Sequence, residues 1–323
     1  MTIRSLPKLT RRRFLSLTAK GIGIAIVSQG LMACSSDDDD EPTVPVTFTS
    51  GVASGDPSQD AVILWTRAAP QDASITTAIT ISWEVAEDQG FSNIVTNGSA
   101  QTNAEKDYTL KVDAQGLSAG TQYFYRFMSG DSVTEVGTTK TLPEGAVASA
   151  KIAVMSCSNY PAGYFNVYDM AAQDSELDAV LHLGDYIYEY GLGGYASENA
   201  ASLGREVLPT TEILSLDDYR MRYAQYRSDE SLQALHRQVP FICVWDDHEI
   251  TNDAYRDGAE NHQANEGDYE ARKVAALQAS FDSMPMRPLV RGGHERFHRS
   301  SHFADVSDFF TMATDCKGCF QRC

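Results

Sequence analysis

The chain has 323 residues, enough for more than one hydrophobic core, and its 42% hydrophobic and 10% aromatic content is that of a globular protein. It carries 44 acidic residues against 26 lysines and arginines, a formal net charge of −18. This charge argues against a nucleic-acid backbone as a standing partner, because phosphates would be repelled unless cations intervened. A small phosphorylated substrate would need a metal ion for the same reason.

The first 34 residues have the features of an export signal rather than of folded structure. The stretch TRRRFLSL places Arg11 and Arg12 before an apolar pair, as in a twin-arginine signal, and the apolar run that follows is too short to span a bilayer. The segment ends in LMAC, which resembles a bacterial lipobox and would leave Cys34 as a lipid-modified N-terminus before an acidic linker over residues 35–46. An uncleaved signal anchor and simple secretion are the alternatives. We therefore expect an extracytoplasmic lipoprotein, in the periplasm or cell envelope, exported by the twin-arginine translocase.

Residues 47–145 are predicted to form an all-β domain. Short alternating runs such as AVILWTRA, ITISWEVA, YTLKVDA and TQYFYRFMSG are separated by turn residues, without a long helical period. In the last run the alternation places Tyr123, Tyr125 and Phe127 on one face. The pattern is typical of a β-sandwich of the fibronectin or immunoglobulin type. The stretch GVASGDPSQD could bind calcium, but a tight turn with Asp56 before a proline is the better interpretation.

From residue 146 to residue 323 the pattern changes to that of an α/β domain. The stretches KIAVMSC, DAVLHLGD and PFICVWDDH are short continuous apolar runs, as expected for strands that are buried on both faces of a sheet. Helices are predicted at about 166–174, 217–237 and 266–283. Cys243, inside the third apolar run, is predicted to lie in the core.

Each of the three predicted strands ends in side chains that can bind metals. Cys157 follows the first strand, Asp185 the second, and Asp246, Asp247 and His248 the third. Because functional groups of open α/β sheets collect at the carboxyl ends of the strands, we expect these residues to converge on one rim.

The spacing of Asp185 and Tyr188 in HLGDYIYE suggests a shared metal ion. A carboxylate at a strand end can bridge two cations, and a tyrosine one turn on can bind one of them once its phenol is deprotonated, which trivalent iron promotes and calcium does not. Asp247 would supply an oxygen ligand to the second ion, and His248 could protonate a leaving group or contact phosphate. The pattern therefore indicates a binuclear site that clamps a phosphate ester.

These residues lie in motifs that resemble the PhoD-like alkaline phosphatase family. The motifs are SCSNYPAGYF, HLGDYIYEYG, LDDYRMRYAQYRSD, VWDDHEITNDAY and EARKVAALQASFDSMPMRP, and the resemblance runs from Phe48 to about Asp315. It implies an α/β fold with a calcineurin-like αββα metallophosphatase core after the sandwich, and hydrolysis of phosphomonoesters and phosphodiesters outside the cytoplasm. The GDxxY motif is also similar to that of purple acid phosphatases.

The resemblance also implies ligands and cofactors. Carried over motif by motif, it assigns Cys157 and Tyr188 to iron, Asp185 to a bridging position and Asp247 to calcium, so that the cofactors would be Fe³⁺ and Ca²⁺. His248 is the candidate catalytic residue. We expect a monomer that acts on a phosphomonoester or phosphodiester and has no nucleic-acid-binding role.

Each of these assignments has a plainer alternative. Cys157 could be a small buried residue, and Tyr188 could pack within its tyrosine-rich run. Asp246 is better explained as a cap of the following turn than as a ligand. His248 could donate to a nearby carboxylate instead of acting on the substrate.

Other parts of the chain could contribute to a substrate site. The glycine-rich stretch over residues 191–212 is predicted to form a mobile wall over the site, where substrate choice would lie. Arginines on a polar helix face are usually only solvated, but three residues could contact phosphate: Asn159, Arg222 and Arg227. No metal is assigned to the regularly spaced histidines His294, His298 and His302.

The resemblance stops short of the family's usual length. A later strand with a GDxH-type motif, which completes the family's metal site, has no counterpart after His302, and the chain ends in CKGCFQRC. We therefore expect a truncated or frame-shifted copy whose sheet exposes an apolar edge and which folds poorly or has weak activity. The alternative, a metal knuckle formed by Cys316, Cys319 and Cys323, has no obvious fourth ligand.

Three functions remain as hypotheses. The leading one is metal-dependent hydrolysis of phosphate esters for extracytoplasmic phosphate acquisition. A phospholipase D-like phosphodiesterase is an alternative within the same chemistry, because a two-metal clamp does not choose between monoesters and diesters. An inactive fragment that serves only as a lipid-anchored binding module is the third.

Overall fold

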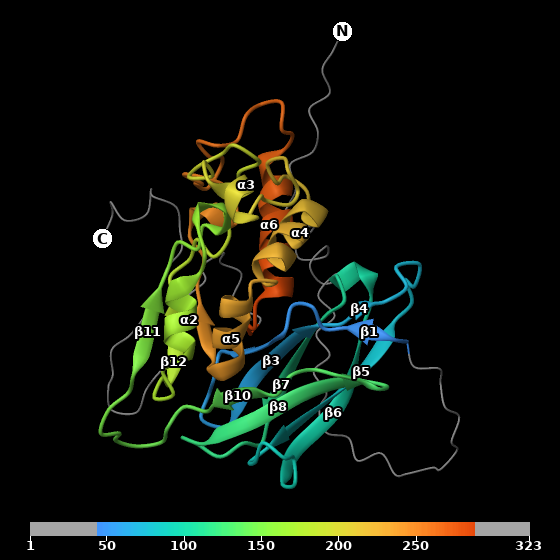
Figure 1. The fold of residues 1–323 in the computed structure, drawn as a ribbon, viewed down its shortest axis with the longest axis vertical. Coiled ribbons are helices and arrows are strands. Elements are labelled where there is room, and N and C mark those ends of the chain that lie inside the picture. Colours follow the sequence, from blue (N-terminus) through green and yellow to red (C-terminus); the bar gives the residue numbers. More distant parts are fainter. Residues whose placement is uncertain (1–43, 288–323) are drawn as a thin grey trace. The chain divides into compact units, whose positions relative to one another are not determined.

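The structure is a computed structural model that describes residues 44–287 (Figure 1). The predicted signal peptide with Cys34, most of the acidic linker, the histidines at 294–302 and the C-terminal cysteines lie outside the described residues. Among the helices of the described part, none is both long enough and apolar enough to cross a membrane.

An all-β part comes first along the chain and an α/β part follows it, in the predicted order. The strands are β1 (Val46–Thr47), β2 (Val52–Gly55), β3 (Ala61–Arg67), β4 (Ala69–Pro70), β5 (Ile79–Ala86), β6 (Ile94–Thr102), β7 (Thr109–Gln115), β8 (Gln122–Ser129), β9 (Ser132–Val133), β10 (Gly137–Lys140), β11 (Ile152–Met155), β12 (Ala179–His182) and β13 (Phe241–Cys243). The helices are α2 (Asn166–Ala172), α3 (Ala200–Leu203), α4 (Leu216–Tyr226), α5 (Glu230–Gln238) and α6 (Tyr269–Ser283). Short 3₁₀ helices are η1 (Ala104–Lys106), η2 (Tyr160–Ala162) and η3 (Asp247–Glu249).

One six-stranded sheet runs through both predicted domains, in the order β11-β12-β13-β2-β3-β7. Strands β11, β12, β13 and β2 are parallel, whereas β2, β3 and β7 pair antiparallel. At the junction, Phe241 of β13 pairs with Gly55 of β2. A Cβ at Gly55 would lie 2.3 Å from the carbonyl oxygen of Pro285, so only glycine allows this close approach. The division into domains at residues 47–145 and 146–323 stays a prediction.

The sandwich core lies between β2-β3-β7 and the second sheet, in which β10, β8, β5 and β6 are neighbours. Val62 and Leu64 of β3 face this core, and from β8 come Tyr123, Tyr125 and Phe127, each at most 1% exposed. Their period of two places all three aromatic side chains on the buried face, which confirms that part of the sequence prediction.

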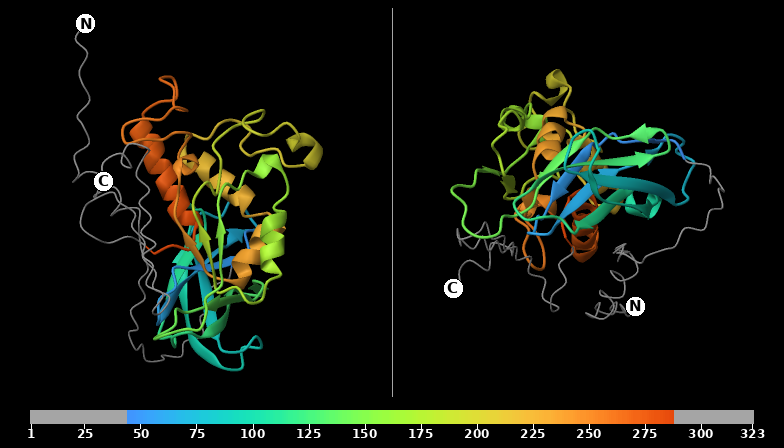
Figure 2. Two further views of the ribbon diagram at one scale, coloured as in Figure 1. Left: turned by 90° about the vertical axis from the view of Figure 1, so that its left-hand side faces the viewer. Right: turned by 90° about the horizontal axis from the view of Figure 1, so that it is seen from below.

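Helices cover the parallel part of the large sheet. Val180 of β12 and Phe241 and Cys243 of β13 pack with residues of α2, α4, α5 and α6, and Cys243 is 3% exposed, as predicted for a core residue. The helices, β11 and β12 lie toward one end of the described part, and most of the sandwich strands lie toward the other (Figure 1, Figure 2). The loops that follow the parallel strands therefore lie on the side of the helices, away from most of the sandwich.

The single helix predicted over 217–237 is wrong, because two helices occupy this segment. Helix α4 ends at Tyr226, and Asp229 caps α5 by accepting a hydrogen bond from the backbone nitrogen of Leu232. Aspartate competes with helix continuation when its side chain binds the next turn's amides. Helices α2 and α6 lie within two or three residues of their predicted bounds at each end.

The buried His182 predicts a loss of stability in acid. Its Nε2 lies 3.1 Å from the Ser158 hydroxyl and 3.0 Å from the Tyr168 hydroxyl, and burial lowers its pKa from 6.5 to about 3. Between these values the unfolded chain binds a proton that the folded chain does not, so stability rises with pH and is lost as pH falls from 6.5 toward 3. In urea unfolding between these pH values, the free energy of unfolding of His182→Gln should rise with pH less steeply than that of the wild type. We expect the slope to be smaller by up to about 1.4 kcal/mol per pH unit. Equal slopes in variant and wild type would contradict the prediction, whatever their absolute stabilities.

Candidate metal centre

The carboxyl ends of β11, β12 and β13 meet at one rim, because these strands are parallel neighbours. Cys157 follows β11, Asp185 follows β12, and Asp247 and His248 lie in η3 just after β13. The candidate residues therefore come from three segments that only the sheet brings together, as the sequence analysis predicted.

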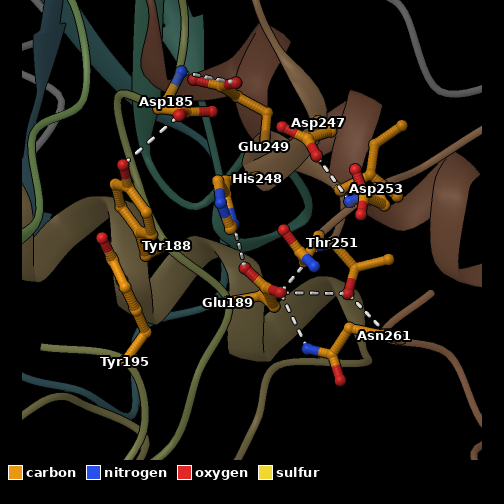
Figure 3. A network of polar contacts seen from close by, with 12 residues as sticks. Asp185, Tyr188, Glu189, Tyr195, Asp247, His248, Glu249, Thr251, Asp253 and Asn261 are labelled. Carbon is orange, nitrogen blue, oxygen red and sulfur yellow. Dashed lines mark hydrogen bonds and ion pairs between the residues drawn. The ribbon is translucent and has the colours of Figure 1, made fainter. Parts of the chain in front are cut away.

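Asp185 lies close to the other candidate ligands, and Figure 3 shows its side chain near those of Tyr188, Asp247 and His248. Its Oδ2 is 3.5 Å from the Cys157 sulfur and 3.3 Å from the Tyr188 hydroxyl. On the other side, Asp185, Asp247 and His248 each offer a ligand atom within 4.8 Å of the other two. A carboxylate with potential ligands on both sides has the position that a bridging ligand requires.

Two of the candidate ligands have a left-handed backbone that aspartate and cysteine seldom adopt. The φ angle is 61° at Cys157 and 52° at Asp185. The two loops also bind each other, because Cys157 N donates to the carbonyl of Gly184 at 3.2 Å and Ser158 N donates to that of Asp185 at 2.8 Å. Strained residues of this kind persist where the surrounding structure holds them, and they concentrate at functional sites.

The rim fits a bound cation better than it fits an empty cluster of acids. Asp185 is 8% exposed, and its Oδ1 has no hydrogen-bond partner within residues 44–287. Burial, opposed by His248 and reinforced by Asp246 and Asp247, raises the pKa of Asp185. Burial and the negative charges of Asp185 and Cys157 also raise the pKa of Tyr188. Positive charge at this point would satisfy the free oxygen and stabilise the anionic form of each group.

The neighbouring aspartates Asp246 and Asp247 have different positions. Asp246 caps η3, accepting a hydrogen bond from the backbone nitrogen of Asp247 at 3.0 Å, as expected for a cap. One oxygen of Asp247 accepts from the backbone nitrogen of Asp253, which orients the carboxylate at the rim. Asp247 therefore remains the better candidate ligand of the pair.

His248 is hydrogen-bonded to a carboxylate that the sequence analysis did not assign. Its Nδ1 lies 2.7 Å from Glu189, and its ring stacks on Tyr188 with 4.2 Å between the ring centres. Burial alone would lower the pKa of His248, but the hydrogen bond and charge of Glu189 outweigh it and raise that pKa. The two interpretations of His248 are compatible, because one ring nitrogen can bind Glu189 while the other faces the rim.

Glu249 is a second carboxylate that the sequence analysis missed. It is 2% exposed and accepts hydrogen bonds from the backbone nitrogens of Asp185 at 3.0 Å, Tyr186 at 2.5 Å and Asp246 at 2.7 Å. Burial and the charge of Asp185 outweigh these hydrogen bonds and raise its pKa to about 8. Glu249 thus ties the loop after β12 to the loop after β13. The sequence DDHEIT around Glu249 is itself polar and acidic, so local pattern gave no signal that this acid is buried.

Arg222 and Arg227 were predicted either to contact phosphate or to be solvated on a polar helix face, and both predictions are wrong. Both side chains are buried, so they are not solvated and are not accessible to a phosphate group. Arg222 is fully buried and donates to the carbonyls of Leu208 at 2.9 Å, Pro209 at 3.2 Å and Tyr188. This anchors part of the 191–212 segment. The guanidinium of Arg227 is 1% exposed and lies 4.1 Å from the centre of a Trp65 ring.

Two other predicted polar residues have structural contacts. The side-chain amide of Asn159 donates to the carbonyl of Tyr195 at 3.1 Å, so this group holds the 191–212 segment. The Asp56 carboxylate accepts from the backbone nitrogen of Arg287 at 2.6 Å, and Asp56 itself has a φ of 42°, as at a tight turn. The tight-turn interpretation of Asp56 therefore fits better than a calcium site.

The chain is similar to known proteins over the residues that form this rim. The profile described as PhoD-like phosphatase matches residues 152–315, and that of the PhoD-like phosphatase N-terminal domain matches residues 33–143. Alkaline phosphatase D of Bacillus subtilis (strain 168) is 39% identical over 275 residues, which are 83% of this chain and 46% of that protein. The solved structure described as the structure of PhoD matches with a TM-score of 0.70 at 39% identity, covering 78% of this chain and 49% of the other.

The chain spans about half the length of each of these two relatives. Over the matched part, the likeness confirms the predicted α/β fold preceded by a β-sandwich. The two profiles together extend across both parts of the fold and over every candidate ligand at the rim. The chain belongs to the PhoD-like phosphatase family.

Proposed function

We propose that this chain hydrolyses phosphate esters at the rim formed by Cys157, Asp185, Tyr188, Asp247 and His248. The observation that carries the proposal is the central position of Asp185, between two groups of potential ligands and with one buried oxygen that has no partner. Family membership supports the reaction class, since the matching profiles are described as PhoD-like phosphatase and the Bacillus subtilis relative is named alkaline phosphatase D.

Each ligand type suits one of two cations. The thiolate of Cys157 and the phenolate of Tyr188 would hold Fe³⁺, and Asp247 would hold Ca²⁺, with Asp185 shared between them. The cations would supply positive charge that polarises the ester and activates the attacking water.

The chain's own groups position the reacting atoms. His248 faces the rim with the ring nitrogen that Glu189 does not bind, and at this atom it can deliver a proton to the departing alcohol oxygen. Glu249 holds the backbone of Asp185 and Asp246 in place, so the carboxylates at the rim need not reorganise when substrate binds.

The place of action and the substrate range are further parts of the proposal. The TRRRFLSL and LMAC stretches support export by the twin-arginine translocase and anchoring through Cys34 as a lipoprotein of the periplasm or cell envelope. The chain would act there as a monomer on phosphomonoesters or phosphodiesters to release phosphate. A phospholipase D-like preference is the alternative within this chemistry.

Elemental mass spectrometry on protein exported by its own signal, combined with turnover of p-nitrophenyl phosphate and bis-p-nitrophenyl phosphate, tests the proposal. We expect about one iron and one calcium per chain together with turnover. Asp247→Asn should lose calcium and turnover, whereas Asp246→Asn, at the neighbouring cap, should retain both metals. Bound metals without turnover of either ester would exclude hydrolysis by this chain, and the absence of both metals would exclude the metal centre.

A further inference from the structure

Glu189 is a buried carboxylate in the loop after β12, and both of its oxygens are occupied (Figure 3). Its side chain is 0% exposed, and Oε2 lies 2.7 Å from Nδ1 of His248. Oε1 accepts from the backbone nitrogen of Asn252 and the side-chain amide of Asn261, each at 2.8 Å, with the Thr251 hydroxyl 3.2 Å away. Because its side chain is fully buried and each oxygen already accepts a hydrogen bond, Glu189 is not assigned as a ligand for metal or substrate.

Burying this carboxylate needs a reason beyond packing. A charged side chain in the interior is costly unless paired and hydrogen-bonded, and an apolar residue would fill the same space at lower cost. The partners of Glu189 come from η3 and from the segment between Thr251 and Asn261, so one side chain ties three segments at the rim. One of these partners is the imidazole of His248, and a hydrogen-bonded carboxylate commonly fixes the orientation of an imidazole ring.

The imidazole of His248 is held on its faces as well as at its edge. Tyr188 stacks on it with 4.2 Å between ring centres, and Tyr190 lies at 5.7 Å. A carboxylate only accepts hydrogen bonds, so Nδ1 must carry a proton, and Nε2 is the nitrogen left for the rim. His248 also offers one of its two ring nitrogens as a ligand atom within 4.8 Å of the ligand atoms of Asp185 and Asp247.

We infer that Glu189 is a positioning residue, which fixes the neutral imidazole of His248 in its Nδ1–H tautomer and presents Nε2 to Asp185 and Asp247. Asn252 and Asn261 in turn fix the orientation of Glu189. Nε2, which carries no proton in this tautomer, can take a proton from solvent and pass it to the departing alcohol oxygen. The consequence for turnover rests on the proposed function, whereas the tautomer is a property of the metal-free chain.

Glu189→Gln changes the tautomer without changing the size of the side chain. The two nitrogen donors at Oε1 require an acceptor there, so the glutamine oxygen faces Asn252 and Asn261 and its NH₂ group faces Nδ1 of His248. Nδ1 must then accept, which moves the ring proton to Nε2. Glu84→Gln is the control, because Glu84 of β5 pairs with Arg126 at 2.7 Å and its substitution removes the same charge in the sandwich, away from the rim.

Long-range ¹H–¹⁵N NMR spectra of the metal-free protein, at a pH where the ring is neutral, report the tautomer directly. The His248 signals are identified by their absence in His248→Gln. We expect the Nδ1–H form in the wild type and in Glu84→Gln, and the Nε2–H form in Glu189→Gln. An Nε2–H form in the wild type would overturn the inference even if the Glu189 variant did not fold.

Kinetics of the metal-loaded chain provide the second readout. Glu189→Gln should lower kcat by about 10- to 100-fold, with KM and metal content within about twofold of wild type. Glu84→Gln should change none of these three quantities. An unchanged kcat in Glu189→Gln would show that the residue is only structural. If the tautomers are as expected but the wild type hydrolyses no ester, the proposed function fails while the positioning role stands.

Discussion

Asp185→Asn should abolish metal binding and ester hydrolysis together. In the proposed site this carboxylate would be shared between Cys157 and Tyr188 on one side and Asp247 and His248 on the other, so its neutral isostere would remove charge from both proposed cation positions. We expect kcat/KM to fall by at least about 10³-fold, equivalent to about 4 kcal/mol of transition-state stabilisation. Steady-state turnover of p-nitrophenyl phosphate and elemental analysis of the same samples measure both effects.

Unfolding measurements separate loss of the Asp185 site from loss of the fold. In the metal-free protein the variant should be at least as stable as the wild type, because an amide replaces a buried carboxylate whose pKa burial already raises. Added metal should stabilise the wild type and not the variant. Asp169→Asn, at an exposed position of α2, is the control and should behave as wild type. An Asp185 variant that still binds both metals would contradict the bridging role.

Gly184→Ala should destabilise the fold more than any other glycine-to-alanine substitution at the rim. Gly184 has a φ of 101°, and a Cβ there would lie 2.3 Å from the backbone nitrogen of Asp246. The neighbouring backbone cannot move away without displacing Asp246 and the cap of η3, so we expect a cost of about 3–5 kcal/mol in the free energy of unfolding. Urea unfolding of the metal-free protein measures this cost.

Gly116→Ala separates the clash from the backbone strain. Gly116 also has a positive φ, 80°, but a Cβ there would have no heavy atom within 4 Å. Its substitution should therefore cost only about 1–2 kcal/mol, the penalty of a left-handed alanine. Equal costs at the two glycines would mean that the close approach at Gly184 does not determine the loop geometry.

Local pattern was sufficient for the order of the fold and for the position of the rim. Alternation in TQYFYRF reports the buried face of β8, because side chains of a strand point alternately to its two faces. Continuous apolar runs report strands β11, β12 and β13, and the residue that follows each run belongs to the same edge when the strands are parallel. Cys157, Asp185 and Asp247 could therefore be grouped without coordinates.

Contacts between distant segments decided the rest. Glu189 and Glu249 look like ordinary acids in the sequence, and their roles depend on His248, which is 59 residues from Glu189, and on the backbone of Asp185, 64 residues from Glu249. Arg222 lies on a helix whose sequence reads as polar, yet it is buried against carbonyls of a loop that the helix pattern does not reveal.

The sequence by itself determined which residues could carry the chemistry, because ligand type and strand ends are local properties. Only the tertiary structure decided which acids are candidate ligands, which are caps and which are buried supports. It also decided that one sheet joins the sandwich to the parallel strands. The physical reason is that a carboxylate's role follows from its burial and its hydrogen-bond donors, and in this chain those donors come from segments far apart in the sequence.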